Sequence, residues 1–187
     1  MKILIISDTH GKLSKFREIY KNLNDIDLIV HCGDYAKDAI SIGDELGKDV
    51  FFVKGNCDGS NTSDDFKILK TEFGNIFVTH GHMLNIRNDY QKLCYKALEN
   101  NCKAVFFGHS HIPCFEESDG LYLVNPGSLT LPKDNTNGSY AIVHTSADDF
   151  YGSIVYYDTV CGTKVNNKNQ KIHGGYLRDL LNYSDRF

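Results

Sequence analysis

Short clusters of histidine, aspartate and asparagine recur along the sequence, and each follows a run of apolar residues. The clusters are Asp8-Thr9-His10, Gly33-Asp34, Gly55-Asn56, His80-Gly81-His82 and Gly108-His109-Ser110-His111. Imidazole, carboxylate and carboxamide groups suit borderline and hard divalent cations, and no thiolate stands at these positions to favour a soft metal. Because one carboxylate can bridge two ions, the set is typical of a two-metal hydrolytic site.

The apolar runs before the clusters predict buried β-strands. They cover residues 3–6, 28–30, 50–53, 76–78 and 104–107, and the first three runs are continuous, as in strands covered on both faces. Helical periodicity in residues 12–23 and 36–46 separates these first three runs and predicts two βαβ units. Ligands of open α/β sheets gather beyond the carboxyl ends of the strands, so the clusters are expected to converge in space.

The second half of the sequence predicts a hairpin, a further helix and later strands. Residues 67–73 and 76–79 flank a Gly-Asn turn, residues 88–100 follow a helical pattern, and strands are expected at 121–124, 140–143 and 153–157. Early βαβ units and late hairpins indicate an α/β fold, with two sheets packed face to face and helices outside.

Residues 173–187 carry one helical stripe of Tyr176, Leu177, Leu180, Leu181 and Tyr183. We interpret it as a C-terminal helix docked on the domain, and a dimer or partner surface is the alternative. The 187 residues contain 3 Pro and no low-complexity run, which predicts one domain over residues 1–187. A homodimer or higher homo-oligomer is compatible with the sequence.

Composition excludes several classes of partner. No signal-peptide core follows Lys2 and no run of 18 apolar residues occurs, so we expect a cytoplasmic protein with no membrane partner. The formal net charge is -4 and Lys and Arg form no run, which argues against extended nucleic acid. The 6 Cys show no CxxC spacing and are expected to be reduced thiols.

In order and type, the five clusters resemble the motifs of the calcineurin-like metallophosphoesterase superfamily: DxH, GD, GNH[DE], a His before Gly, and GHxH. The resemblance runs from Met1 to about Thr145, and residues 125–128, Asn-Pro-Gly-Ser, also resemble its small single-domain bacterial and archaeal phosphodiesterase branch. It implies a four-layer α/β/β/α sandwich of two mixed sheets flanked by helices. It also implies hydrolysis of a small-molecule phosphodiester by two divalent metal ions and a bridging hydroxide.

The same resemblance implies the metal ligands. One ion would be held by Asp8, His10, Asp34 and His111, and the other by Asp34, Asn56, His80 and His109. Mn is expected to support activity in vitro, and Fe, Zn, Ni or Co also suit this mixed donor set. Taken singly, Asp8 could be a helix cap, and Asp34 or Asn56 an ordinary turn residue. Their recurrence at five strand ends favours the metal site.

Asn56, Cys57 and His82 are the catalytic candidates. Cys57 stands where many superfamily members carry a His placed to protonate the departing oxygen, and a thiol of ordinary pKa, about 8.5, is a poorer donor. We therefore expect diesters with good leaving groups to react best. Alternatively, Cys57 only fills space and His82 or water supplies the proton. His82 could contact substrate or hold His80, while His31, inside a strand, is expected in the core.

Two other functions are compatible with the resemblance. The retromer subunit of this superfamily serves chiefly as a protein-binding scaffold and its ligand set is degraded, whereas all seven expected ligands are intact here. Some relatives cut DNA, but this sequence has neither a basic groove nor the length for an added capping domain. We therefore expect an enzyme, a phosphoric diester hydrolase, and the sequence leaves its physiological substrate open.

Overall fold

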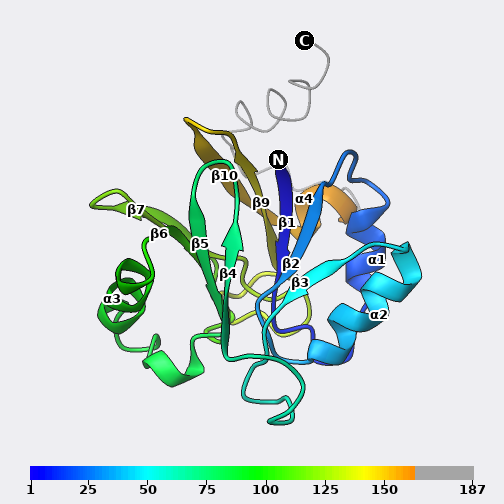
Figure 1. Cartoon of the computed structure of the whole chain (residues 1–187). Coiled ribbons are helices and arrows are strands. Elements are labelled where there is room, and N and C mark those ends of the chain that lie inside the picture. Colours follow the sequence, from blue (N-terminus) through cyan, green and yellow to red (C-terminus); the bar gives the residue numbers. More distant parts are fainter. Residues whose placement is uncertain (163–187) are drawn as a thin grey trace.

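Two five-stranded mixed sheets pack face to face with helices on their outer faces (Figure 1). This computed structural model describes residues 1–162. The arrangement confirms the expected four-layer sandwich, in which α1, α2 and α4 lie beside one sheet and α3 beside the other. The helix expected at 173–187 lies outside the described residues.

The first sheet has the strand order β10-β9-β1-β2-β3. Its parallel strands are β1 (Lys2–Ile6), β2 (Leu28–His31) and β3 (Val50–Phe52), joined through α1 (Ser14–Tyr20) and α2 (Ala36–Leu46). These are the two predicted βαβ units. Antiparallel β9 (Ser139–Thr145) and β10 (Phe150–Tyr156) complete the sheet, and the short helix α4 (Tyr157–Cys161) follows.

One strand differs from the expectation. All three residues of β3 are half-buried, so the prediction of a strand covered on both faces is wrong there. The reason is its place at the edge of the sheet, next to β2 alone. Only Val53, directly after the strand, is fully buried.

The second sheet has the order β4-β5-β6-β8-β7. Its elements are the predicted hairpin β4 (Phe66–Lys70) and β5 (Asn75–Thr79), the 3-10 turn η1 (His82–Leu84), α3 (Gln91–Glu99), β6 (Cys102–Phe106), β7 (Cys114–Ser118) and β8 (Leu121–Asn125). β5, β6 and β8 run parallel, and β7 pairs antiparallel with β8. β7 was not predicted because its last three residues are polar and exposed on an edge strand.

Three apolar clusters hold the layers together. The first lies between the sheets and includes Ile5, Val30 and Phe106, all fully buried. The second packs α1 and α2 on the first sheet, and the third packs α3 on the other. Each large side chain buried this way contributes roughly 1.5–3 kcal/mol. Because both sheets are anchored through the shared inner cluster, the loops beyond their strands have fixed relative positions.

The register aligns the strand ends that carry the sequence clusters. Ile6 pairs with His31 and His31 pairs with Phe52, so β1, β2 and β3 end at one level. In the other sheet, Val78 pairs with Phe106. The 6 cysteines are all free thiols, as expected. Within residues 1–162, no helix is long and apolar enough to cross a membrane.

Candidate metal centre

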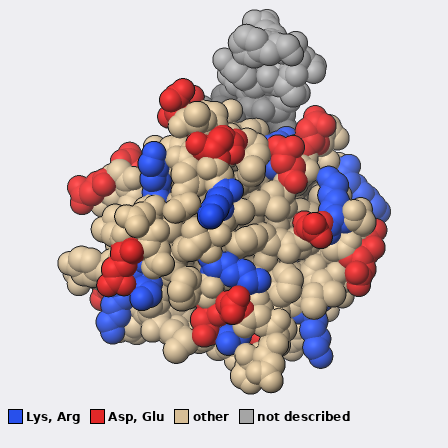
Figure 2. Space-filling model, in the orientation of Figure 1, with Lys and Arg blue, Asp and Glu red and all other residues tan. Residues whose placement is uncertain are grey.

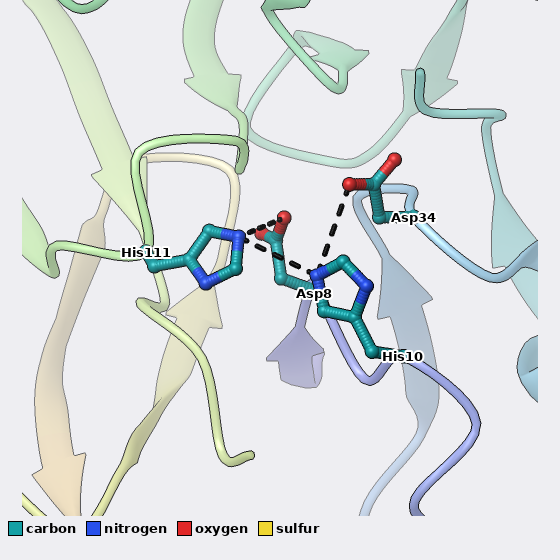
Figure 3. Close-up of side chains that lie close together, drawn as sticks. All are labelled: Asp8, His10, Asp34 and His111. Atoms are coloured by element: carbon teal, nitrogen blue, oxygen red, sulfur yellow. Dashed lines mark hydrogen bonds and ion pairs between the residues drawn. The ribbon is translucent and has the colours of Figure 1, made fainter. Parts of the chain in front are cut away.

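Four of the expected ligands meet in one cluster. Asp8 and His10 follow β1, Asp34 follows β2 and His111 follows β6. One possible ligand atom from each residue lies within 4.8 Å of those of the others. Figure 3 shows these side chains pointing toward one another from separate loops. Residues about 100 positions apart in the sequence therefore form a group that could hold a metal ion.

His111 faces the Asp8 carboxylate through a nitrogen that carries no proton in the neutral ring. His111 Nδ1 lies 2.6 Å from the carbonyl oxygen of Leu131, so it donates there and Nε2 keeps its lone pair. This Nε2 lies 3.1 Å from Asp8 Oδ1 and 3.5 Å from His10 Nε2. Asp8 Oδ1 is buried and accepts no hydrogen bond from any of the described residues, 1–162. Acceptors that face one another in a buried space need a proton or a cation between them.

His80 shows the same arrangement on the other side of Asp34, next to Asn56. Its Nδ1 lies 2.8 Å from the carbonyl oxygen of Cys32, which fixes the ring proton there. Its Nε2 then faces three oxygens: Asn56 Oδ1 at 3.2 Å, Asp34 Oδ1 at 3.3 Å and Asp8 Oδ1 at 3.9 Å. The carbonyl groups thus select the tautomer that exposes a metal-binding nitrogen.

The charges of the centre depend on one another. Burial disfavours the charged rings of His80 and His111, but the carboxylates of Asp34 and Asp8 outweigh this and raise both imidazole pKa values. Burial likewise opposes ionisation of Asp8 and Asp34, but His111 and His80 outweigh it and lower both carboxyl pKa values. Without an ion, protons supply the positive charge that this set of oxygens and nitrogens requires. A divalent cation would replace those protons.

His109 completes the group around His80. Their ring centroids lie 5.1 Å apart, and the backbone N–H of His109 donates to Asp8 Oδ2 at 3.0 Å. Burial, His80 and Arg87 together lower the pKa of His109 to about 4. The ring is therefore neutral at physiological pH, which is the form that binds metals.

The loop backbone is bent to aim these side chains inward. Positive φ angles, uncommon in residues other than glycine, occur at Asp8 (54°), His10 (47°), Asp34 (57°), His109 (66°) and His111 (59°). Such strain persists where the surrounding structure enforces it and is concentrated at functional sites. All five residues belong to the predicted ligand set.

Two glycines let the loops approach the carboxylates. A Cβ on Gly55 would lie 2.2 Å from Asp34 Oδ1, and one on Gly108 would lie 2.7 Å from Asp8 Oδ2. These distances are shorter than any real contact, so a side chain at either position would displace a carboxylate. The Gly before Asn56 and the Gly before His109 are therefore required by packing against the centre.

A buried series of hydrogen bonds supports the loop that carries Asp8 and His10. The Gly33 N–H donates to His31 Nδ1 at 3.2 Å, so the proton of the neutral ring is on Nε2, which lies 2.9 Å from Thr9 Oγ1. Thr9 donates in turn to Asp38 Oδ2 at 2.6 Å, and Gly11 N–H donates to the same oxygen at 2.8 Å. Burial lowers the pKa of His31 to about 4, in keeping with a neutral ring. The core placement expected for His31 is confirmed.

Residues 125–128 fix two of the ligand loops. Ser128 Oγ donates to the carbonyl oxygen of Asp8 at 2.8 Å and accepts the N–H of Leu131 at 3.0 Å. Asn125 Nδ2 donates to the carbonyl oxygen of Gly108 and to Ser110 Oγ, both at 3.0 Å. Both side chains are fully buried. The Asn-Pro-Gly-Ser segment therefore holds the β1 and β6 loops together.

Asp58 ties the Asn56 loop to α2. Its Oδ1 accepts the N–H of Ala36, the first residue of the helix, at 2.8 Å, and its Oδ2 accepts the N–H of Gly55 at 2.9 Å. It thus caps a helix N-terminus from another loop. Thr9, Asp38 and Asp58 were given no role from the sequence, because single Thr and Asp residues are common in loops and in the first turns of helices.

Cys57 lies at the rim, exposed to solvent. Its N–H donates to Asp34 Oδ1 at 2.9 Å, and Asn56 Nδ2 lies 3.4 Å from its sulfur. Burial and the Asp34 carboxylate raise the pKa of Cys57 to about 11. The thiol of the chain alone is therefore protonated at neutral pH.

His82 lies beside the rings of the second group. Its ring centroid is 5.4 Å from that of His80 and 6.2 Å from that of His109, and its buried Nδ1 makes no hydrogen bond within residues 1–162. It is not among the residues that line the hollow at the centre. Whether His82 contacts substrate or holds His80 in place stays a prediction.

Five of the seven expected ligands line a hollow of about 460 Å³: His10, Asp34, Asn56, His109 and His111. Two cationic side chains that belong to none of the sequence clusters also line the hollow. They are Arg87, between η1 and α3, and Lys133, after the Asn-Pro-Gly-Ser segment. Leu131 and Pro132 add apolar surface. No sequence signal distinguished these four residues, since single Lys and Arg residues are common on any surface.

Comparison with known proteins identifies the family. A model of the calcineurin-like phosphoesterase superfamily domain matches residues 1–148. The chain belongs to this superfamily. It is 35% identical over 159 residues to the probable metallophosphoesterase YsnB of Bacillus subtilis, a match that covers 84% of the chain and 91% of that protein. It is 30% identical over 145 residues to phosphodiesterase MJ0936 of Methanocaldococcus jannaschii, covering 68% and 83%.

Solved structures agree with this membership of the calcineurin-like phosphoesterase superfamily. A predicted phosphoesterase of Streptococcus pneumoniae superposes with a TM-score of 0.70 at 26% identity, covering 84% of this chain and 90% of that one. Vps29 of Entamoeba histolytica, solved with Zn²⁺, superposes with a TM-score of 0.68 at 21% identity, covering 84% and 99%. The second likeness is one of fold.

Proposed function

We propose that the protein is a divalent-metal-dependent phosphodiesterase acting on a small molecule. The observation that carries the proposal is the convergence of side-chain donor atoms: His80 Nε2 lies 3.3 Å from Asp34 Oδ1 and His111 Nε2 lies 3.1 Å from Asp8 Oδ1, while Nδ1 of each ring is held by a backbone carbonyl oxygen. Such a set of His, Asp and Asn donors fits divalent first-row metals. Mn is the metal expected to support activity in vitro, with Fe, Zn, Ni or Co as alternatives.

Asp34 is the proposed bridge between two ions. Its Oδ2 lies 3.9 Å from His10 Nε2 and its Oδ1 lies 3.3 Å from His80 Nε2, so its two oxygens face different histidines. Asp8, His10 and His111 would complete one site, and Asn56, His80 and His109 the other. When bound, two such ions lower the pKa of a water molecule and stabilise charge on phosphoryl oxygens.

The residues of the chain orient the reaction in this proposal. The carbonyl groups of Cys32 and Leu131 keep Nε2 of His80 and of His111 facing the carboxylates of Asp34 and Asp8. Asn56 would bind an ion at the exposed edge of the centre. Cys57 stands where a proton donor to the leaving group would be placed. Because a thiol is a poorer proton donor near neutral pH than an imidazole, diesters with good leaving groups are the expected substrates.

The choice of a diesterase has two supports. The relative MJ0936 carries the name phosphodiesterase. In addition, the face in Figure 2 carries Lys and Arg interspersed with Asp and Glu, without the continuous basic groove typical of a nuclease. A scaffold function remains the rival from a different class, and it predicts no turnover.

Hydrolysis of bis(p-nitrophenyl) phosphate tests the proposal. Mn-loaded protein should release nitrophenol, and EDTA should abolish the release. Metal content, measured by mass spectrometry after removal of free ions, should approach two per chain. Full loading without turnover of this or any other nitrophenyl phosphoester would overturn the proposed activity in favour of the scaffold.

A further inference from the structure

The hollow at the metal centre is larger than one phosphate group requires. Its volume of about 460 Å³ corresponds to roughly 15 water molecules at about 30 Å³ each. The ligands of the proposed ions form one part of its wall. Arg87 and Lys133 belong to the remaining part, so a substrate that fills the hollow would contact both side chains.

Both cations are uncommitted within residues 1–162. Arg17, Lys54 and Lys96 each pair with a carboxylate, whereas Arg87 and Lys133 form no ion pair and no side-chain hydrogen bond there. In the described part of the chain, two positive charges therefore lie beside the centre without forming an ion pair.

Both cations are also close to the ligand histidines. The backbone N–H of Lys133 donates to the carbonyl oxygen of His111 at 3.1 Å, which fixes the base of the lysine at the centre. Arg87 lines the same hollow as His109. The two side chains thus approach from separate segments, one after η1 and one after residues 125–128.

The charge on a simple diester does not require these residues. Two divalent ions would more than offset the Asp8 and Asp34 carboxylates, so the single negative charge of a diester is already balanced. A further anionic group held in the same hollow would meet the two cationic side chains that line it. Arginine in particular matches the geometry of phosphate oxygens through two parallel N–H donors.

Resting on the proposed phosphodiesterase function, we propose that Arg87 and Lys133 bind a second phosphate carried by the substrate. The preferred substrate is then a phosphodiester with a further phosphate monoester on one arm, as in a phosphorylated nucleotide ester. Arg87 and Lys133 determine specificity in this scheme, and the metal-bound diester is the group that reacts.

A matched pair of substrates tests this. Thymidine 5′-(p-nitrophenyl phosphate) and its 3′-phosphorylated form share the leaving group and differ by one phosphate. The Mn-loaded wild type should show a kcat/KM at least about 10-fold higher for the phosphorylated form, the range of one charge-assisted contact. In Arg87→Gln/Lys133→Gln, this ratio should fall close to one. Lys37→Gln on α2, exposed and outside the hollow, removes a charge and should keep the wild-type ratio.

Calorimetry provides a readout apart from turnover. Wild-type protein should bind thymidine 3′,5′-bisphosphate at least about 10-fold more tightly than thymidine 5′-monophosphate, and the double variant should bind both alike. A wild type that makes no distinction in either assay would overturn the inference and leave the diesterase intact. Tighter binding of the bisphosphate without turnover of any diester would instead overturn the proposed function and support the assigned anion site.

Discussion

The two halves of the candidate centre differ in how firmly the chain holds them. Around Asp8, the side chains are buried or half-buried, and the Thr9–His31–Asp38 chain supports them from behind. On the other side, His80 is fully buried but Asn56 is exposed, and the His109 side chain makes no hydrogen bond within residues 1–162. Preorganised donors lose less entropy on binding, so the half around Asp8 is expected to bind its ion more tightly.

The shared carboxylate gives the largest expected effect. Asp34→Ala should lose both ions and reduce activity to background, because its two oxygens face both halves. His144→Ala should keep both ions, since His144 lies on β9, stacked on Tyr151 and outside the centre. Metal analysis and nitrophenyl diester turnover are the measurements. Wild-type turnover in Asp34→Ala would show that the assignment of the bridge is wrong.

A variant of the exposed half should separate the two ions. Asn56→Ala is expected to keep one ion per chain and to lose about 100-fold in activity, because only the second half loses a donor. Titration of Mn into the chelated protein, followed calorimetrically, gives the stoichiometry. Asn24→Ala, which changes an exposed asparagine outside the five clusters, is the control. Loss of both ions in Asn56→Ala would contradict the expectation that the half around Asp8 binds its ion without the other half.

The support behind the first half should have a smaller effect. Thr9→Val keeps the shape of the side chain but removes the group between His31 and Asp38, so the tighter ion should bind about 10-fold more weakly. The free energy of unfolding should fall by roughly 1–3 kcal/mol, since a buried donor is left unpaired. Thr71→Val breaks a similar bond to Gly74 in the β4–β5 turn and should leave metal affinity unchanged. Equal affinity in Thr9→Val and wild type would contradict a supporting role.

The smallest effect concerns the rim of the exposed half. Replacing Cys57 with His restores a group that protonates a departing oxygen near neutral pH, so turnover should depend less steeply on the leaving-group pKa. A series of aryl and alkyl diesters measures the slope for both proteins. Identical slopes would mean that Cys57 only fills space and that another group supplies the proton.

How far the sequence predicts this molecule depends on the range of the interactions. The strands before Asp8 and Asp34 were predictable because continuous apolar runs and motif spacing are local signals. By contrast, the bond from Ser128 to the carbonyl oxygen of Asp8 joins residues 120 positions apart, and only the packed sheets bring them together. Arg87 and Lys133 belong to the same class, because a single surface cation has no signature until a hollow lies beside it.

Both sheets must be docked before the centre exists. Asp8 and the backbone of His109 meet across 101 residues, and each partner sits in a loop of a different sheet. Closing so large a loop costs entropy before any contact rewards it, which makes these among the late events of folding. An isolated segment of residues 1–65, which ends before β4, would have Asp8, His10 and Asp34 but no imidazole from the second sheet. Metal uptake during refolding should therefore report the final docking of the two sheets.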